Sequence, residues 1–355
     1  MFGEYTGKRI LITGHTGFKG SWLALWLKQK GSAVKGMALQ PEKGRRNLFE
    51  EARINEAITS EFVDIRDFTA VERTLNDFQP EIIFHLAAQA LVRRSYRDPI
   101  GTFASNVMGT AHVLEAARRT PSVKAVVCVT TDKVYRNRER EQGYREEDEL
   151  GGKDPYSASK ACAELVAGAY MQTLFPLDGT VALATARGGN VVGGGDWSED
   201  RLIPDLVRSL ADSQDIVLRN PGAIRPWQHV LELCSGYLQL ASCLLQDRAK
   251  AIGAWNFGPD RENEVEVEVL TKDFIKAWGR PESCVRVEPA DLPEAGVLKL
   301  DNTKARQVLG WRPVLGYART IRWTADWYSA FYEKRKSATD LVFEQIRAFE
   351  ELASE

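Results

Sequence analysis

Short apolar runs alternate with amphipathic segments through the first half of the chain. The runs Arg9–Thr13, Ile82–Ala87 and Ala125–Val129 are apolar without a polar residue at every second position. Strands of this kind are buried on both faces, as in a parallel sheet that is covered by helices. The remaining segments are two expected strands, Ala33–Leu39 and Phe62–Ile65, and the expected helices Ser21–Lys30, Thr69–Phe78, Val107–Arg119 and Pro155–Gln172. The pattern predicts an α/β fold with a Rossmann-type doubly wound parallel sheet.

Two local signals set expected helix boundaries. Gly31 follows the first helical segment and is expected to end it as a C-terminal cap. The residues Thr69-Ala-Val-Glu72 have the spacing of a capping box, in which the threonine and glutamate side chains bind each other's backbone amides. We therefore expect a helix to begin at Thr69.

The pattern changes after Arg187, where glycine and proline become frequent and the helices shorter. Leu231–Gln246 predicts a helix and Gly253–Phe257 a strand, so the chain is expected to return to its first domain there. We divide it into a dinucleotide-binding Rossmann domain (1–187 plus about 226–258) and a smaller C-terminal α/β substrate-binding region (188–225 and 259–330). Glu264–Val269 predicts an exposed strand, and residues 331–355 a charged, solvated terminal helix.

A glycine-rich turn follows the first expected strand. Gly14, Gly17 and Gly20 are spaced as G-x-x-G-x-x-G, with Phe18 and Lys19 between the last two, and the turn opens a helix. Glycines let the backbone approach a pyrophosphate, and the amides at a helix N-terminus bind its negative charge. The position after the first strand favours nucleotide binding over a purely structural turn.

The residues alone leave the choice between NAD and NADP open. An acidic side chain about 20 residues after the glycines would bind the ribose 2′-hydroxyl, but Ala38-Leu39-Gln40-Pro41 contains none, and Glu42 is the nearest candidate. Arg45 and Arg46 could instead hold the 2′-phosphate of NADP.

A tyrosine and a lysine share one face of an expected helix. Tyr156 and Lys160 are four residues apart, and they follow the strand that ends at Val129. A nearby ammonium favours the phenolate, so we expect a lowered Tyr156 pKa and a tyrosine that acts as a base. Tyr332 and Lys336 have the same spacing but lie in the charged terminal segment, where an exposed pair is the simpler interpretation.

Composition narrows the class of partner. With 47 basic and 49 acidic residues, the chain has no strong net field to attract nucleic acid or anionic lipid. The five cysteines include no C-x-x-C pair and the four histidines are scattered, so neither a disulfide framework nor a metal site is expected. The N-terminal residues do not resemble a signal peptide, and no apolar run reaches membrane-spanning length. We predict a cytoplasmic protein with a small-molecule partner.

Longer motifs add a specific resemblance. The glycine turn, His85-Leu-Ala-Ala-Gln89, Asn106 with Gly109-Thr110, and the Tyr156–Lys160 pair together resemble the extended short-chain dehydrogenase/reductase family. Within it, Thr131-Asp132-Lys133 resembles the Thr-Asp-Glu motif of the nucleotide-sugar 4,6-dehydratase branch. Further matches to this branch are Gly143–Glu146, Arg187–Trp197 and Ile224–Val230. The similarity extends to about residue 330, and among substrates it implies CDP-glucose, with NAD as the cofactor.

The resemblance also implies a role for individual residues. Asp64 and Ile65 would lie beside the adenine, and Leu86, Ala87, Ala88 and Asn106 would line the cofactor channel. Tyr156 would be the base, helped by Thr131, and Lys160 would bind the cofactor ribose. The substrate would be held by Asn190 and Arg225 at the diphosphate, where the planar fork of arginine suits phosphate, and by Arg201 and Leu202 near the nucleobase. Gly194 stands where many relatives have proline. Relatives commonly pair through the Tyr156 helix, which implies a homodimer or homotetramer.

The implied reaction is an internal oxidation, elimination and reduction. Tyr156 removes the C4 hydroxyl proton, Asp132 protonates the departing C6 hydroxyl, and the hydride taken from C4 returns to C6. Lys133 stands where related enzymes carry a glutamate base for the C5 proton. An ammonium with a reference pKa near 10.4 is no base at neutral pH, so Lys133 requires either a lowered pKa or a water relay as a neutral amine.

Two other interpretations compete with this one. A nucleotide-sugar 4-epimerase, or a dehydratase of another nucleotide hexose, would use the same scaffold. A non-catalytic nucleotide-sensing protein would not need Thr131, Tyr156 and Lys160, all of which are present. Release of water separates dehydration from epimerisation, and competition among nucleotides separates the substrates.

Overall fold

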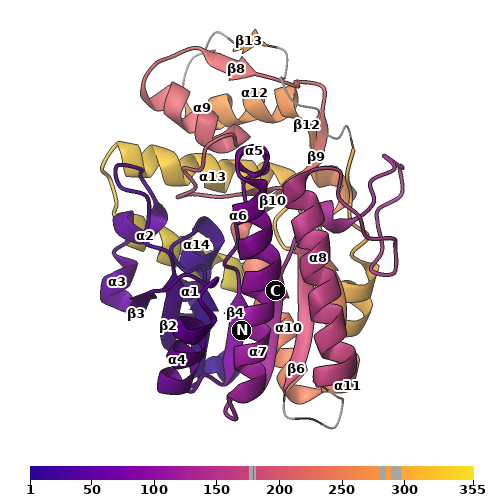
Figure 1. The fold of residues 1–355 in the computed structure, drawn as a ribbon. Coiled ribbons are helices and arrows are strands. Elements are labelled where there is room, and N and C mark those ends of the chain that lie inside the picture. Colours follow the sequence, from indigo (N-terminus) through magenta and orange to yellow (C-terminus); the bar gives the residue numbers. More distant parts are fainter. Residues whose placement is uncertain (176–178, 180, 280–284, 289–296) are drawn as a thin grey trace.

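The computed structural model contains a seven-stranded parallel sheet with the strand order β11-β6-β5-β4-β1-β2-β3 (Figure 1). The structure describes residues 1–175, 179, 181–279, 285–288 and 297–355. The strands of this sheet are β1 (Arg9–Thr13), β2 (Ala33–Ala38), β3 (Thr59–Phe62), β4 (Ile82–His85), β5 (Ala125–Val129), β6 (Ala182–Gly188) and β11 (Gly253–Phe257). The predicted doubly wound Rossmann-type fold is confirmed.

Helices cover both faces of the sheet (Figure 1). Side chains alternate along each strand, so Leu11 and Ile83 enter one core cluster while Ile10 and Ile82 enter the other. The helices on the Leu11 side are α4 (Phe68–Phe78), α7 (Gly109–Arg119) and α8 (Pro155–Ala169), and those on the Ile10 side include α1 (Phe18–Gln29) and α10 (Val230–Gln246). Strands buried on both faces explain the apolar runs without alternation.

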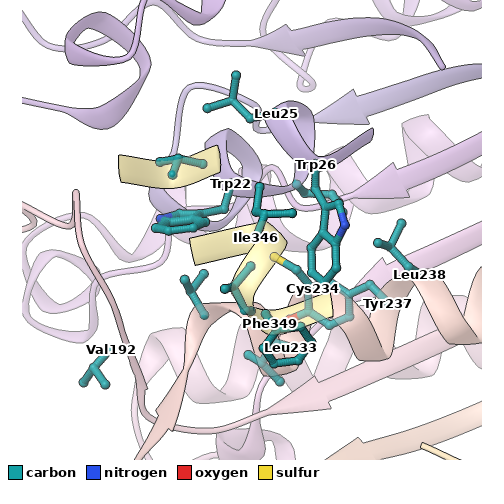
Figure 2. Close-up of a cluster of buried hydrophobic side chains, with 14 of the residues drawn as sticks. Trp22, Leu25, Trp26, Val192, Leu233, Cys234, Tyr237, Leu238, Ile346 and Phe349 are labelled. Carbon is teal, nitrogen blue, oxygen red and sulfur yellow. The ribbon is translucent and has the colours of Figure 1, made fainter. Parts of the chain in front are cut away.

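The end of the chain belongs to the core, which corrects the expectation of a solvated terminal helix. Helix α13 (Tyr317–Tyr332) is followed by α14 (Ala338–Leu352), and α14 packs against α1. Figure 2 shows Ile346 and Phe349 facing Trp22 and Trp26 of α1. Apolar residues of α14 recur at helical spacing and are buried, while charged residues such as Arg347 and Glu351 lie exposed between them and Glu350 pairs with the end of α1. Counting charges alone therefore concealed an amphipathic helix.

A smaller set of elements lies above the carboxyl ends of the sheet strands (Figure 1). Three two-stranded pairs and two helices form it: β7 (Val191–Val192) with β10 (Gln228–His229), β9 (Ile224–Pro226) with β12 (Glu264–Glu266), β8 (Ile216–Leu218) with β13 (Val285–Val287), α9 (Leu202–Ala211) and α12 (Val267–Trp278). The strand expected at Glu264–Val269 stops at Glu266. From Val267 onward the helical spacing of Leu270, Phe274 and Trp278 prevails, because all three are buried.

The chain returns to the main sheet partway through the smaller set of elements, as the helix and strand expected at Leu231–Gln246 and Gly253–Phe257 predicted. Strand β11 pairs with β6 at the sheet edge, and α10 packs against β5 and β6. The proposed domain boundaries at 187, 226 and 258 remain a prediction, as do those of the substrate-binding region.

The remaining regular segments are short. They are α2 (Leu48–Glu51), α3 (Ile54–Ala57), α5 (Val92–Arg97), α6 (Pro99–Phe103), α11 (Arg248–Ala251), the 3₁₀ turns at Gly3–Tyr5, Asp132–Val134 and Arg261–Asn263, and π-helical turns at Ala104–Met108, Tyr170–Leu174 and Ala305–Leu309. The first π turn joins α6 to α7 and contains Asn106.

Two boundary predictions were wrong. Strand β3 is Thr59–Phe62 and not Phe62–Ile65, because this edge strand is polar and half-exposed, so hydrophobicity does not mark it. Helix α4 is capped by Asp67, whose side chain accepts from the amide of Ala70, and not by Thr69. Gly31 has φ of +76° directly after the capping residue of α1, as predicted for a glycine at a helix end.

Candidate functional site

The glycine turn brings three segments into backbone contact. Gly14 has φ of +78°, and a Cβ there would lie 2.7 Å from the amide nitrogen of Ala87. A Cβ on Gly20 would lie 2.2 Å from the carbonyl oxygen of Gly14. Gly17 caps α1, and a Cβ there would meet nothing closer than 3.4 Å, so it leaves open space at the N-terminal amides of the helix. The turn therefore has the open, amide-rich form that accepts a pyrophosphate.

Phe18 and Lys19 begin helix α1 beside this turn. Phe18 packs against the core, within reach of Gly193. Lys19 extends toward Tyr237 of α10, with 3.5 Å between its Nζ and the phenol oxygen. The pKa of Lys19 is lowered to about 8, first by burial and then by the positive charges of Arg201 and Lys160. Positive charge thus gathers under the turn, as an anionic ligand requires.

The Tyr156 side chain is linked to the loop that follows β5. Its hydroxyl hydrogen-bonds Thr131, and Thr131 Oγ1 donates to Asp132 Oδ1 at 2.9 Å. All three side chains are buried. The amide of Tyr156 donates to Ser95 Oγ at 3.1 Å, which fixes the start of α8. The arrangement is a continuous hydrogen-bonded path from a phenol to a carboxylate.

The expected lowering of the Tyr156 pKa is wrong. Burial raises it to about 12, while the hydrogen bond to Thr131 and the charge of Arg201 act in the opposite direction. The Lys160 ammonium donates to the carbonyl of Val129 at 2.9 Å. Burial also lowers the pKa of Lys160 to about 8. The spacing of Tyr156 and Lys160 placed both on one helix face, but it could not show how strongly burial opposes their charged forms.

The Asp132 carboxylate has one engaged and one unengaged oxygen. Oδ1 accepts from Thr131 and lies 3.6 Å from Lys133 Nζ, whereas Oδ2 is buried and has no hydrogen-bond partner among the described residues. A Cβ on Gly189 would lie 3.0 Å from Oδ2. The Lys133 side chain is 36% exposed, so it meets the buried Asp132 carboxylate from the solvent side. Asp132 and Lys133 therefore form an ion pair at the end of the Tyr156–Thr131 path.

The expected cofactor channel is held by side-chain hydrogen bonds. Asn106 donates to Ser159 Oγ at 2.8 Å and accepts from the amide of Gln89 at 2.8 Å. Thr13 accepts from the amide of Ala87 and ties this segment to β1. Leu86, Ala87 and Ala88 are half-buried along the same edge. The π turn at Asn106 thus places the amide between the β4 loop and helix α8, a common setting for π turns at functional sites.

The residues expected at adenine lie after β3. Asp64 pairs with Arg66 and is half-buried, and this ion pair lowers the pKa of Asp64. Ile65 is buried against Gly109 and its carbonyl accepts from His112. Both stand at the carboxyl end of a sheet strand, where open α/β sheets bind ligands.

The two arginines considered for a 2′-phosphate have other partners. Arg45 pairs with Glu42 and with Glu199, at 2.9 and 2.7 Å. The Arg46 guanidinium pairs with Glu51 and lies over the rings of Trp197, Phe331 and Tyr332. Glu42 is also held by Arg94, so it is equally engaged. Both arginines are therefore already paired, and the Glu42 carboxylate lies beside Arg45. A 2′-phosphate is disfavoured in this position, which supports NAD.

The residues expected to bind the substrate all come from the segments that follow β6. Asn190 joins β6 to β7, and its carbonyl accepts from the amide of Gln228. Arg225 lies in β9 and pairs in register with Val265. Leu202 opens α9 and is partly buried. Arg201 caps α9, pairs with Asp196 at 3.0 Å, and its charge acts on both Tyr156 and Lys19. Arg201 is therefore closer to the reacting groups than the resemblance implied.

Sequence reasoning assigned no role to Asp196, which holds Arg201, or to Gly189, where a Cβ would crowd Asp132. Both residues lie in the glycine-rich stretch after Arg187, where the sequence pattern changes. The unusual composition of this stretch was the only sequence feature that could have pointed to them. Gly194 fits Trp327 so closely that a Cβ would lie 2.0 Å from the indole. That packing explains why this loop carries glycine.

The described residues contain no group of three or more histidine, cysteine or acidic side chains that could hold a metal ion. In the same described part, no helix is long and apolar enough to cross a bilayer. The functional groups of the site are therefore its glycine turn, its lysines and the path from Tyr156 to Asp132.

The fold and this constellation define an extended short-chain dehydrogenase/reductase. The sequence model of the family described as GDP-mannose 4,6 dehydratase matches residues 11–324. The chain belongs to this 4,6-dehydratase family.

Individual relatives agree with this assignment. A CDP-glucose 4,6-dehydratase of Salmonella typhimurium is 48% identical over 331 residues, 92% of each chain. A UDP-glucose 4-epimerase of Mycolicibacterium smegmatis is 29% identical, over 90% of this chain and 98% of its own. Among solved structures, the dTDP-glucose 4,6-dehydratase DesIV of Streptomyces venezuelae, with NAD bound, has a TM-score of 0.78 at 28% identity and covers 92% of this chain and 98% of its own.

Proposed function

We propose that the protein converts CDP-glucose to CDP-4-dehydro-6-deoxyglucose, a hydro-lyase reaction that uses NAD. The observation that carries the proposal is the 48% identity to a CDP-glucose 4,6-dehydratase across 92% of both chains. The hydrogen-bonded path from Tyr156 to Asp132 supports it independently, because a dehydratase needs both a base at C4 and an acid at C6.

The residues present fit NAD. The glycine turn and the N-terminus of α1 would hold its pyrophosphate, Lys160 and Tyr156 its ribose, and the segment 86–88 with Asn106 would line its channel. The chemistry supplied by NAD there would be reversible hydride transfer, from sugar C4 and back to C6.

The chain's own residues then move protons. Tyr156 takes the proton of the C4 hydroxyl while its own proton passes through Thr131 Oγ1 to Asp132. Because the two transfers are coupled, the phenolate, which burial disfavours, does not accumulate. A ketone at C4 makes the C5 hydrogen acidic, so elimination follows once a base and an acid face C5 and C6.

Asp132 and Lys133 can supply that base and acid together. Their ion pair, at 3.6 Å, is a carboxylate beside an ammonium. The proton from the C4 hydroxyl makes Asp132 the carboxylic acid, and Lys133 reaches the neutral amine form by releasing its ammonium proton to solvent from its 36% exposed side chain. Lys133 then takes the C5 proton, Asp132 protonates the leaving C6 hydroxyl, and water departs. Lys133 returns a proton to C5 as hydride reaches C6, which leaves Lys133 as the neutral amine and Asp132 as the carboxylate for the next turnover.

The remaining roles concern the substrate. Asn190 and Arg225 would hold the diphosphate, and Arg201 and Leu202 would lie between it and the nucleobase.

We also propose a cytoplasmic location and a place in the synthesis of deoxyhexoses for bacterial surface polysaccharides such as the O-antigen of lipopolysaccharide. Pairing of two or four copies is supported by exposed apolar side chains on the α6–α8 face, among them Ile100 at 79% and Leu165 at 63% exposure.

A panel of CDP-, dTDP-, UDP- and GDP-glucose tests the proposal. Each is incubated with the purified protein and NAD, and the products are analysed by mass spectrometry. We expect loss of one water, with turnover highest for CDP-glucose. An isomer of unchanged mass would establish an epimerase, and preference for another nucleotide would correct the substrate. Binding without turnover of any sugar would favour the nucleotide-sensing alternative.

A further inference from the structure

A buried ion pair lies behind the site, on the side of α8 that faces the sheet. Glu164 and Arg187 are 2.8 Å apart, and their side chains are 3% and 4% exposed. Charged side chains are rarely buried so completely unless they are paired and hydrogen-bonded. The pair takes no part in the proton path described above, so its position requires another explanation.

The Glu164 carboxylate joins three elements. It accepts from Thr130 Oγ1 at the end of β5, from Thr185 Oγ1 in β6 at 2.8 Å, and from Arg187 Nη2. Thr130 directly precedes Thr131, and Glu164 lies one helical turn after Lys160 on α8. The carboxylate therefore ties the strand end that carries Thr131 and Asp132 to the helix that carries Tyr156 and Lys160.

The Arg187 guanidinium extends the connection. Its Nη1 donates to Tyr135 Oη at 2.7 Å and to the carbonyl of Glu146 at 3.0 Å. Tyr135 donates in turn to Asn256 of β11. Because Arg187 is the penultimate residue of β6, which leads to Gly189 and Asn190, the loop expected to contact the substrate begins beside an anchored residue.

We infer that Glu164 is a positioning residue, which holds the Thr131–Lys133 loop in register with Tyr156 through Thr130 and keeps a negative charge one turn from the Lys160 ammonium. This inference deepens the proposed dehydration and rests on it for its effect on turnover.

The charge role follows from what surrounds Lys160. His85 of β4, Cys128 of β5, Lys19 of α1 and Glu164 of α8 face it. Burial lowers the pKa of Lys160 to about 8, whereas the charges of Cys128 and Glu164 act to raise it. Burial raises the pKa of the Cys128 thiol to about 12, so the negative charge beside Lys160 is the Glu164 carboxylate, which is ion-paired with Arg187 at 2.8 Å. Lys160 must be charged to bind a ribose and to favour the Tyr156 phenolate.

The first experiment measures the charge role with Glu164→Gln, which keeps the shape of the side chain. NAD affinity and turnover are measured from pH 6 to 9, and circular dichroism checks folding. As the pH is raised, we expect the NAD affinity and the turnover of Glu164→Gln to decline at a pH at least half a unit lower than in the wild type. This shift is on the order of the effect of one buried charge. Thr185→Val removes a hydrogen bond to the same carboxylate but no charge, and should leave both pH profiles in place. Superimposable Glu164→Gln and wild-type profiles would overturn the charge role.

The second experiment measures the tether and does not depend on Glu164→Gln folding. Loss of one partner of a buried pair is strongly destabilising, whereas Thr130→Val is isosteric and leaves the pair intact. We expect Thr130→Val to lower kcat by about tenfold with NAD affinity unchanged, and Thr185→Val to lower it less than twofold. Equal kcat values for the two variants would refute the tether.

NAD titration needs no sugar nucleotide. A failed substrate panel with a shifted NAD profile would therefore reject the proposed function and retain the charge role of Glu164. The opposite result, dehydration with unshifted profiles, would reject that role alone.

Discussion

Gly189 lies directly against Asp132. A Cβ on Gly189 would stand 3.0 Å from Oδ2, the carboxylate oxygen that has no hydrogen-bond partner in the described part of the chain. A side chain at Gly189 would therefore crowd the unengaged oxygen on the side of Asn190, where the sugar is expected.

Gly189→Ala should consequently impair turnover. The added methyl crowds Oδ2, so we expect kcat for CDP-glucose to fall about tenfold or more while NAD affinity stays within twofold. Gly222→Ala is the matched control, because a Cβ there meets nothing within 4 Å. Steady-state kinetics and NAD titration decide the matter, and normal kcat in Gly189→Ala would show that the sugar does not approach this oxygen.

Tyr156→Phe removes the hydroxyl that begins the proton path and keeps the ring. Turnover should fall by about 100-fold or more, the usual size of a lost general base, with NAD binding retained. Tyr332→Phe is the control. It loses only an acceptor for Trp197 Nε1, so kcat should not change. A Tyr156→Phe enzyme with near-normal turnover would remove this residue from the mechanism.

Lys133→Met deletes the amine and keeps most of the stem. Oxidation at C4 does not use Lys133, so the variant should still reduce bound NAD when CDP-glucose is added, seen as absorbance near 340 nm. It should then stall before water is lost, with little exchange of the C5 hydrogen in heavy water. Release of the 6-deoxy product at a normal rate would mean that another group removes the C5 proton.

Arg45→Ala tests the cofactor preference. Because Arg45 is already paired with Glu42 and Glu199, we expect NAD affinity to change less than threefold, and NADP to bind more weakly than NAD both before and after the substitution. Calorimetric titration of both cofactors measures this. Tighter binding of NADP by the wild type, lost in Arg45→Ala, would show that this arginine holds a 2′-phosphate.

Glu232→Gln addresses stability. Burial raises the pKa of Glu232 to about 8, although the amides of Leu315 and Val314 donate to Oε1 and act to lower it. The folded state therefore holds a proton that the unfolded state releases near pH 4.5, and the wild type loses stability as pH rises from about 4.5 to 8. The amide oxygen of glutamine keeps both hydrogen bonds without the charge.

At pH 8 the Glu232→Gln protein should be more stable than the wild type by on the order of 1 kcal/mol or more, and the two should converge toward pH 5. Chemical denaturation at both pH values provides the comparison. The half-exposed Glu268 supplies the control, since Glu268→Gln should have no such effect. A wild-type advantage at pH 8 would contradict the expected cost of charging Glu232.

Hydrophobic pattern and motif spacing were sufficient for the central strands and for placing Tyr156, Lys160 and the glycine turn at one sheet edge, because these features depend on residues close in sequence. Strand β3 was misplaced, since a polar edge strand has no apolar signature. The Tyr156 pKa was misjudged because burial depends on the whole fold. The partners of Arg45 and Arg201, and the closeness of Gly189 to Asp132, arise between distant segments or through loop geometry that no local pattern encodes.

Helix α14 has a consequence for the order in which the protein is made. Trp26 Nε1 of α1 donates to Glu350 at 2.8 Å, across 324 positions of the chain. The helix expected to cradle the pyrophosphate thus leaves the ribosome well before the helix that covers its apolar face, since 324 positions separate Trp26 from Glu350. Until then Trp22 and Trp26 lack part of their cover. NAD affinity should therefore be acquired late in synthesis, and nascent chains that stop before residue 338 should engage chaperones through the uncovered face of α1.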